Sequence, residues 1–308
     1  QWEQALSCLL EARQARTMPP AIAYNTTISA CSKSRAWGHA MSLFGLMSQE
    51  SVAANVVTFN ATIDACCMGQ SWARSLELLQ EMGTRGVVPD IITFNSLMRA
   101  CSRALRWETV TELLREMKRA RSRPDSTTYC TALGACQTGL RWDWALQLWA
   151  KMIQDRLAPN AITHSVAMKA CSKAWKWEQA LELLAEAHPL RIDQNIVTYS
   201  VAISACEKGW EWAGALKLLG ETLRNSVVPN TITYNATISA CEKGRQWAKA
   251  LALLDEMRQV RTASDTITYS AVISAFAKTW AWEVALELLR EMRQQEIMPN
   301  TITYSALI

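Results

Sequence analysis

The sequence is poor in the residues from which most catalytic and metal sites are built. Its 308 residues include only three histidines, His39, His164 and His188. None of them belongs to an HExxH or an HxE…CxxC pattern, and the sequence contains neither a P-loop nor a nucleophile elbow. We therefore expect no catalytic residue, no metal ligand, no cofactor and no small-molecule substrate in this segment.

Long apolar runs, glycine and proline are also scarce. No run approaches the roughly 20 apolar residues that span a bilayer, so we expect no membrane partner. The 11 glycines and 8 prolines are too few for a low-complexity chain, whereas 50% hydrophobic residues can form a continuous core. The net charge of +4 permits an anionic partner but does not demand one. No signal peptide is visible at Gln1.

The ten cysteines do not form a disulfide or zinc pattern. Seven of them recur every 35 residues: Cys31, Cys66, Cys101, Cys136, Cys171, Cys206 and Cys241. Stacked helical layers lie about 10 Å apart, whereas a disulfide needs Cα atoms within about 7 Å. No CxxC is present. We therefore expect small, buried thiols in a reducing compartment.

The 35-residue period runs through the whole chain. Eight complete copies follow one another without insertion, at residues 21–55, 56–90, 91–125, 126–160, 161–195, 196–230, 231–265 and 266–300. Partial copies occupy 1–20 and 301–308, so the chain starts and stops inside repeats. The period predicts a single solenoid over residues 1–308 rather than two ordinary domains.

Each copy has the apolar spacing of two helices. In the copy 231–265, Tyr234, Ile238 and Cys241 share one helix face, and Gly244 follows them. A second amphipathic helix begins at Trp247, and Pro-Asn or Pro-Asp closes many copies, where it can turn the chain and cap the next helix. The pattern predicts an all-α fold of stacked helix-turn-helix repeats.

Tryptophan recurs at one position of the repeat, where the second helix begins. These residues are Trp2, Trp37, Trp72, Trp107, Trp142, Trp177, Trp212, Trp247 and Trp282. A row of aromatics can serve as a base-stacking platform, but this register favours packing in the core. Five tryptophans fall outside it, and four of these, Trp149, Trp175, Trp210 and Trp280, are expected at the surface or between repeats.

The period and the run Thr233-Tyr234-Asn235 … Ala250-Leu251-x-Leu253-Leu254-x-Glu256-Met257 resemble the pentatricopeptide repeat family, plain 35-residue type. The Trp that opens the second helix departs from the family's leucine-like residue, which should alter packing rather than binding. Trp- and Cys-rich copies of this kind look like those of dinoflagellate algae. The resemblance implies a right-handed superhelix that binds single-stranded RNA, one base per repeat.

In the family, the fifth and last residues of a repeat read the base, and the second residue flanks it. The fifth residues here are Asn25, Asn60, Asn95, Cys130, Ser165, Ser200, Asn235 and Ser270. The last residues are Asn55, Asp90, Asp125, Asn160, Asn195, Asn230, Asp265 and Asn300. The second residues are Ile22, Val57, Ile92, Thr127, Ile162, Val197, Ile232 and Ile267, all of them β-branched.

The chemistry at these positions suits base reading, although a plainer interpretation exists. Asn offers both a donor and an acceptor, Ser a hydroxyl, and Asp acceptors only. Asn or Asp after Pro is also a common helix cap, and duplication alone makes repeats alike. The fifth and last residues nevertheless vary from copy to copy, while the Trp is constant. Recognition of different bases requires such variation, whereas a scaffold does not. The family's pairing rule then implies the target 5′-(C/U)UU-N-AAUA-3′, with the base at Cys130 and Asn160 left open.

A cation recurs eight places after the fifth residue, where the resemblance implies phosphate contact. These residues are Lys33, Arg103, Lys173, Lys208, Lys243 and Lys278. A cation at the end of a helix also suits the helix dipole. Six phosphate contacts would give a salt slope of about −4.

The resemblance implies stabilisation, processing or translation of an RNA in an organelle, a chloroplast before a mitochondrion. Two alternatives stay open. One is a protein-binding scaffold or assembly subunit of an organellar RNA or ribosomal complex. The other is the specificity part of a larger RNA-processing enzyme.

Overall fold

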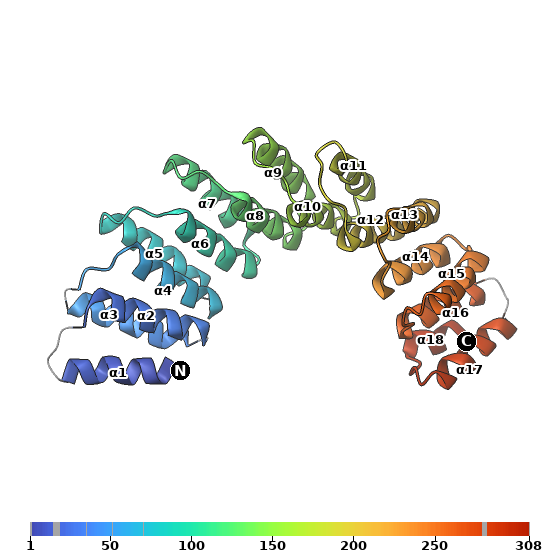
Figure 1. Cartoon of the computed structure of the whole chain (residues 1–308), viewed down its shortest axis with the longest axis horizontal. Coiled ribbons are helices and arrows are strands. Elements are labelled where there is room, and N and C mark those ends of the chain that lie inside the picture. Colours follow the sequence, from blue (N-terminus) through green and yellow to red (C-terminus); the bar gives the residue numbers. More distant parts are fainter. Residues whose placement is uncertain are drawn as a thin grey trace. The chain divides into compact units, whose positions relative to one another are not determined.

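The computed structural model describes residues 2–14, 19–34, 36–50, 52–69, 71–278 and 282–307. This part of the chain contains α-helices and no strand, which confirms the all-α class (Figure 1). The helices group into two compact units, residues 1–139 with 147–158 and residues 140–146 with 159–308. We refer to them as unit 1 and unit 2.

Helices alternate in two series at the 35-residue spacing. After α1 (Trp2–Gln14), the first helices of the copies are α2 (Ala21–Lys33), α4 (Val56–Met68), α6 (Ile91–Arg103), α8 (Ser126–Thr138), α10 (Ala161–Lys173), α12 (Ile196–Lys208), α14 (Thr231–Lys243), α16 (Thr266–Ala277) and α18 (Thr301–Leu307). The second helices are α3 (Trp37–Gln49), α5 (Trp72–Thr84), α7 (Trp107–Arg119), α9 (Trp142–Gln154), α11 (Trp177–Ala187), α13 (Trp212–Arg224), α15 (Trp247–Gln259) and α17 (Trp282–Gln294).

Within each unit, first helices pack on first helices. In unit 1, α2 contacts α4, α4 contacts α6, and α6 contacts α8; in unit 2 the same holds from α10 through α18. Apart from α9, which the two units share, each second helix contacts its own first helix and the first helix of the next copy, as α3 does with α2 and α4. This pattern buries apolar faces that a single hairpin would leave in water.

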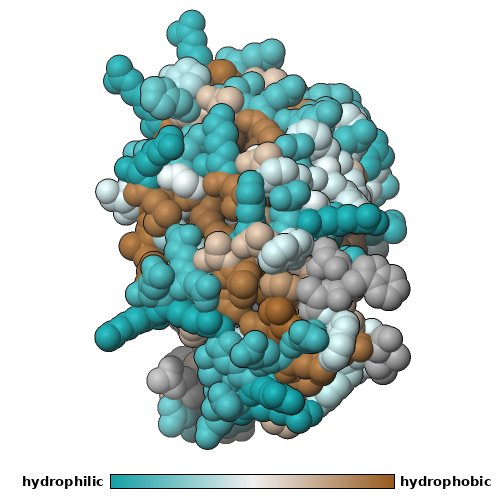
Figure 2. All heavy atoms as spheres, turned by 90° about the vertical axis from the view of Figure 1, so that its right-hand side faces the viewer, coloured by the Kyte–Doolittle hydropathy of each residue, from teal (hydrophilic) through white to brown (hydrophobic). Residues whose placement is uncertain are grey.

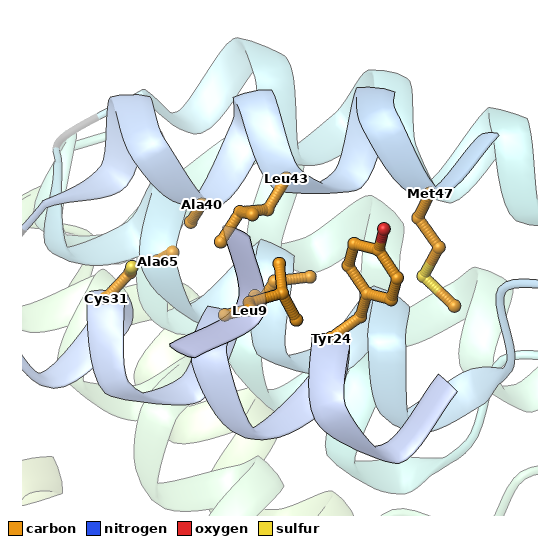
Figure 3. Close-up of a cluster of buried hydrophobic side chains, with 8 residues drawn as sticks. Leu9, Tyr24, Cys31, Ala40, Leu43, Met47 and Ala65 are labelled. Carbon is orange, nitrogen blue, oxygen red and sulfur yellow. The ribbon is translucent and has the colours of Figure 1, made fainter. Parts of the chain in front are cut away.

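Buried side chains of neighbouring copies share one core within a unit. In unit 1, Tyr24 and Met47 lie side by side between α2 and α3, and Ala65 of α4 lies against Cys31 (Figure 3). Leu9 of α1 belongs to the same cluster. Full burial of each aromatic ring of this kind stabilises the fold by roughly 1.5–3 kcal/mol. The second-helix positions of Ala40 and Met47 recur in later copies as further buried residues.

The seven cysteines in register are buried thiols, as expected, whereas Cys8 is exposed and Cys130 is half-buried. All ten are free, and the seven in register are at most 1% exposed. Burial raises the pKa of Cys66, Cys171, Cys206 and Cys241 to about 11. These thiols therefore stay neutral and unreactive near pH 7.

The expectation that the in-register tryptophans belong to the core is wrong. None of them is buried, and Trp282 is 59% exposed. Instead, four of the rings pack against a glycine at the end of the next first helix: Trp37 at Gly69, Trp107 at Gly139, Trp177 at Gly209 and Trp212 at Gly244. A Cβ added at Gly244 would lie 2.3 Å from the Trp212 ring, and one at Gly69 equally close to Trp37. Glycine stands there because the indole needs the space.

The turns have a backbone that the sequence analysis did not anticipate. The helix before Gly244 ends at Lys243, but Gly244 itself has an ordinary φ of −77°, and the next residue, Arg245, is left-handed with φ 55°. Large residues occupy the same position elsewhere, including Trp175 and Trp210, which are 65% and 64% exposed. Trp149 is buried, and Trp280 lies outside the described residues.

Candidate nucleic-acid interface

The second residues of the copies form a series of exposed β-branched side chains. The apolar ones range from 43% exposed at Val197 to 73% at Ile22, and Thr127 is exposed as well. Figure 2 shows apolar side chains at the surface of the C-terminal end, between hydrophilic ones, and the exposed apolar residues of that part include Ile267 and Ile302. An apolar residue that recurs exposed beside polar side chains suits contact with a flat, partly apolar ligand.

The last residue of each copy caps the next first helix. The Oδ1 atom of Asp90 accepts the backbone N–H of Thr93 at 2.8 Å, and the Thr93 hydroxyl accepts the backbone N–H of Asp90 at 3.2 Å. The same threonine follows every last residue by three places: Thr58, Thr93, Thr128, Thr163, Thr198, Thr233, Thr268 and Thr303. This capping signal, Asn or Asp followed by Thr at the third helical position, can be seen in the sequence. The threonine is nevertheless absent from the predicted site residues.

The cap fixes how the last side chain is turned. The bonds to the helix end go to Oδ1, as at Asn55, Asp125 and Asn230. The second polar atom is therefore directed away from the helix end. That atom is an acceptor oxygen in Asp and a donor amide nitrogen in Asn.

In three copies an asparagine at the fifth position is hydrogen-bonded to an aspartate at the last position. The amide Nδ2 donates to the carboxylate Oδ1 at 3.1 Å in Asn60–Asp90, 3.4 Å in Asn95–Asp125 and 3.0 Å in Asn235–Asp265. The threonine of the next helix donates to the Oδ1 atom of the same asparagine, at 2.6 Å between Thr93 and Asn60. Two bonds thus hold each asparagine in one orientation.

The three aspartates of these pairs are ionised near pH 7. Burial acts to raise the pKa of the Asp90 carboxyl, but hydrogen bonds from Thr93 and Asn60 outweigh burial and hold this pKa below its ordinary value. The same causes lower the pKa of Asp125 and Asp265. These copies therefore present acceptors only at the last position.

The serine copies are arranged differently. Ser270 Oγ lies 2.7 Å from Thr303 Oγ1 and 3.4 Å from Asn300 Oδ1, and Ser200 Oγ lies 3.0 Å from Thr233 Oγ1. Ser165 donates to the carbonyl of Ile162 in its own helix at 2.9 Å. Because Ser is shorter than Asn, these copies leave more room in front of the last residue.

The first complete copy borders a cavity of about 710 Å³. Its lining includes Ile22 and Val57, the second residues of two successive copies, together with Asn25, Asn55 and Lys33. Asn25 is 9% exposed, and its Oδ1 atom has no hydrogen-bond partner among the described residues. An unsatisfied buried acceptor is costly, and here it belongs to the cavity wall. In the fourth copy, Cys130 is half-buried in unit 1 and Asn160 is exposed in unit 2.

The row of cations is partly neutralised. Lys243 Nζ lies 3.0 Å from Glu207 Oε1, and Lys278 Nζ lies 2.9 Å from Glu242 Oε1. Each glutamate belongs to the preceding copy, and the sequence analysis missed both because the pairing crosses repeats. Lys208 donates to the Ser172 carbonyl at 3.1 Å. Burial, together with Lys173 and Lys243, outweighs Glu207 and lowers the pKa of Lys208.

Two absences hold for the part of the chain that the structure describes. No three His, Cys, Asp or Glu side chains gather there as a metal site. No described helix combines the length and the apolar content that a membrane crossing needs.

Comparison with known proteins places the chain in a family. A family model described as the pentacotripeptide-repeat region of PRORP matches residues 11–191, more than half of the chain. The PPR repeat family matches residues 229–278 and 264–308, and a pentatricopeptide repeat domain matches residues 182–244. The chain therefore belongs to the pentatricopeptide repeat family. No curated protein matches it significantly.

Solved structures share the fold. The pentatricopeptide repeat protein PPR10 from maize is 25% identical, with a TM-score of 0.73 over 99% of this chain and 44% of that one. The same protein in complex with an 18-nt psaJ RNA element is 18% identical, with a TM-score of 0.79 over 99% of this chain and 45% of that one. The solenoid of stacked helix-turn-helix repeats is thereby confirmed. The chain spans less than half the length of these relatives.

Proposed function

We propose that this chain binds single-stranded RNA in a sequence-specific manner, with one base read by each repeat. The observation that carries the proposal is the paired arrangement of the fifth and last residues, locked by the cap and flanked by exposed β-branched side chains. The likeness to PPR10, whose structure holds an 18-nt RNA element, supports it.

Hydrogen-bond chemistry explains how the last residue discriminates between bases. Uracil carries an N–H donor on its ring nitrogen, whereas cytosine and adenine carry a lone pair at the corresponding Watson–Crick edge. The free carboxylate oxygen of Asp90, Asp125 or Asp265 accepts from uracil and repels cytosine or adenine. The amide nitrogen of a last-position Asn donates to cytosine or adenine instead.

The fifth residue discriminates by size. Asn60, held over Asp90, fills the space in front of the last residue and leaves room for a pyrimidine. Ser270 is shorter and admits a purine. Applied copy by copy, this chemistry agrees with 5′-(C/U)UU-N-AAUA-3′, in which Asn25 with Asn55 selects C before U. The β-branched residues at positions such as Ile22 and Val57 hold the base flat between successive copies.

The role of the bound RNA follows from occupancy. A segment held in the groove is shielded from nucleases and kept unfolded, which supports stabilisation, processing or translation of an organellar transcript, in a chloroplast before a mitochondrion. A protein scaffold of an organellar complex is the second candidate. The neutralisation of Lys243 and Lys278 by glutamates favours it, because an RNA groove gains from free cations.

The test is a fluorescence-anisotropy titration with the eight-base RNA placed in a longer unstructured strand. The same sequence as DNA and an RNA with its A and U positions exchanged serve as controls. We expect clear preference for the matched RNA, and the double change Ser270→Asn with Asn300→Asp should redirect the last base from A to U. Equal binding of all strands would refute base reading and send the search to protein partners.

A further inference from the structure

The turn between α7 and α8 differs in charge from the other turns of its kind. Lys118, Arg119, Arg121 and Arg123 fall within six residues, whereas the same six positions of every other complete copy hold at most two Lys or Arg. The turn belongs wholly to unit 1. Repetition of the fold does not require this charge, since neighbouring copies form the same turn without it.

The basic turn borders a cavity of about 530 Å³. The lining residues are Lys118, Arg121, Ser122, Arg123, Pro124, Asp155 and Leu157. The one carboxylate among them, Asp155, already accepts from Lys118 Nζ at 2.8 Å and from the Tyr129 hydroxyl at 2.5 Å. Arg121 and Arg123 are exposed, and within the described part of the chain neither forms an ion pair.

Further cations that do not line the cavity lie near it. Burial lowers the pKa of Lys151, and the charges of Lys118 and Arg115 lower it further, against an opposing effect of Asp155. Lys151 therefore lies close enough to Lys118 to feel its charge. An anion that enters the cavity meets several cations and one carboxylate that is already paired.

The cavity adjoins one of the proposed base-reading pairs. Pro124, in its lining, directly precedes Asp125, which caps α8 and accepts from Asn95. Arg123 is two residues from Asp125, so their Cα atoms are at most about 7 Å apart. A nucleotide read by Asn95 and Asp125 would thus have its phosphates within reach of an arginine side chain.

The next copy, residues 126–160, lacks the side chains that other copies carry at the positions proposed to contact RNA. It has Thr127 where other copies carry an apolar residue, Cys130 where they carry Asn or Ser, and Thr138 where most carry a cation. A strand that is weakly held at this copy needs another attachment nearby. The cationic cavity stands at the junction between this copy and the one before it.

We propose that the cavity lined by Lys118, Arg121 and Arg123 binds a backbone phosphate of the RNA, beside the nucleotide read by Asn95 and Asp125. This inference rests on the proposed function. The planar guanidinium fork of arginine matches a phosphate in a bidentate manner. The site anchors the strand independently of sequence at the point where base reading lapses.

The test compares two double variants of equal charge in the full chain. Arg121→Gln with Arg123→Gln removes the proposed contacts. Arg191→Gln with Arg261→Gln is the matched control, because both residues are exposed and occupy the left-handed turn position of Arg121 in other copies. Two probes are titrated over a salt series: the matched RNA and an abasic oligomer of eight sugar-phosphate units, which offers no base to read.

We expect the R121Q/R123Q variant to bind both probes about tenfold more weakly, with a salt slope that is smaller in magnitude by about 1.4, or 0.7 for each lost contact. Base preference should not change. The control variant should alter either affinity by less than about twofold, as its charge is lost away from the cavity.

Several outcomes would overturn the proposal. Equal effects of the two variants would mean that only net charge matters, and an abasic oligomer that fails to bind the unaltered chain would remove the phosphate site. If the R121Q/R123Q variant binds RNA with unchanged affinity and base preference, this inference is wrong and the proposed function is unaffected. If the abasic oligomer binds through these arginines but the chain shows no preference among RNA sequences, the phosphate site stands and the proposed base reading fails. Inorganic phosphate that binds through these arginines without displacing RNA would assign the cavity to a free ion.

Discussion

At the scale of single residues, the fold uses one side chain for two purposes. In the last residue of each copy, Oδ1 accepts the hydrogen bond that caps the helix. Only the second polar atom of the side chain can then meet a ligand. Asp and Asn cap equally well, so the two can be exchanged without loss of the helix while the group presented to the ligand changes from acceptor to donor. Stability and specificity are thereby separated within one amino acid.

This separation predicts the effect of Asp90→Asn. The copy would then carry the Asn–Asn pair of the first copy, and its preferred base should change from U to C by roughly tenfold, within the 1–3 kcal/mol of a good base contact. The melting temperature should hardly move because the cap persists. Competition binding with RNAs that differ at the second base measures the change, and Asp193→Asn, at an exposed turn residue, is the control.

We expect His164 to make unit 2 sensitive to mild acid. It is fully buried, its Nε2 donates to the Leu183 carbonyl at 2.8 Å, and burial lowers its pKa against the opposing effects of that bond and of Glu186. Below about pH 6.5 the unfolded chain takes up a proton that the folded chain resists. Stability should therefore fall as the pH drops from 7.5 to 5.5.

Thermal unfolding at these two pH values tests the role of His164. The variant His164→Tyr, which carries the residue found in Tyr129 and Tyr199 of neighbouring copies, should lose most of the pH-dependent shift in melting temperature. His188→Tyr, at an exposed site, should keep it. A shift that survives His164→Tyr would assign the acid sensitivity to other groups.

At the scale of the helical element, a close approach between copies sets the stacking. The Trp at the start of a second helix lies on the last turn of the next first helix, where glycine stands in four copies: Gly69, Gly139, Gly209 and Gly244. This contact links the end of one element to the start of another. In these four copies the close approach therefore depends on a residue that carries no side chain.

The variant Gly244→Ala should destabilise the fold by about 1–3 kcal/mol, because its Cβ would overlap the Trp212 ring. A second change, Trp212→Leu, should recover most of that loss. Gly220→Ala is the matched control, since nothing lies within 4 Å of the added Cβ, and it should stabilise helix α13 by about 0.5–1 kcal/mol. Chemical denaturation measures all three, and equal effects at Gly244 and Gly220 would exclude the packing explanation.

At the scale of the whole molecule, the sequence predicts the elements better than their contacts. Period, helix pairs, buried cysteines and caps at residues such as Asn55 follow from spacing alone, because a repeated apolar pattern has one way to be buried. The exposure of Trp282 and the pairing of Lys243 with Glu207 do not, because both depend on how one copy meets the next. The places of Asn60 and Asp90 in one pair came from the family resemblance, while their bonds through Thr93 required the structure.

Ion pairs between neighbouring copies of unit 2 lead to a prediction about the row of cations. Glu242 holds Lys278 at 2.9 Å and also accepts from Ser274 at 2.6 Å, so this glutamate removes one cation from the row expected to face phosphate. The variant Glu242→Gln should free Lys278 while it keeps an acceptor for the serine. RNA affinity should rise about threefold at low salt, and the salt slope should grow in magnitude by about 0.7 for one added phosphate contact.

The control for this prediction is Glu283→Gln, which makes the same change of charge at an exposed residue of α17. If the charge acts only by long-range attraction, the two variants should raise RNA affinity equally. If Lys278 contacts a phosphate, Glu242→Gln should raise affinity more than Glu283→Gln, and the gain should require Lys278. The double variant Glu242→Gln with Lys278→Gln should therefore return to the slope of the unaltered chain or below it. If the salt slope stays raised in the variant without Lys278, Glu242 acts through its long-range electrostatic effect on RNA binding rather than through Lys278.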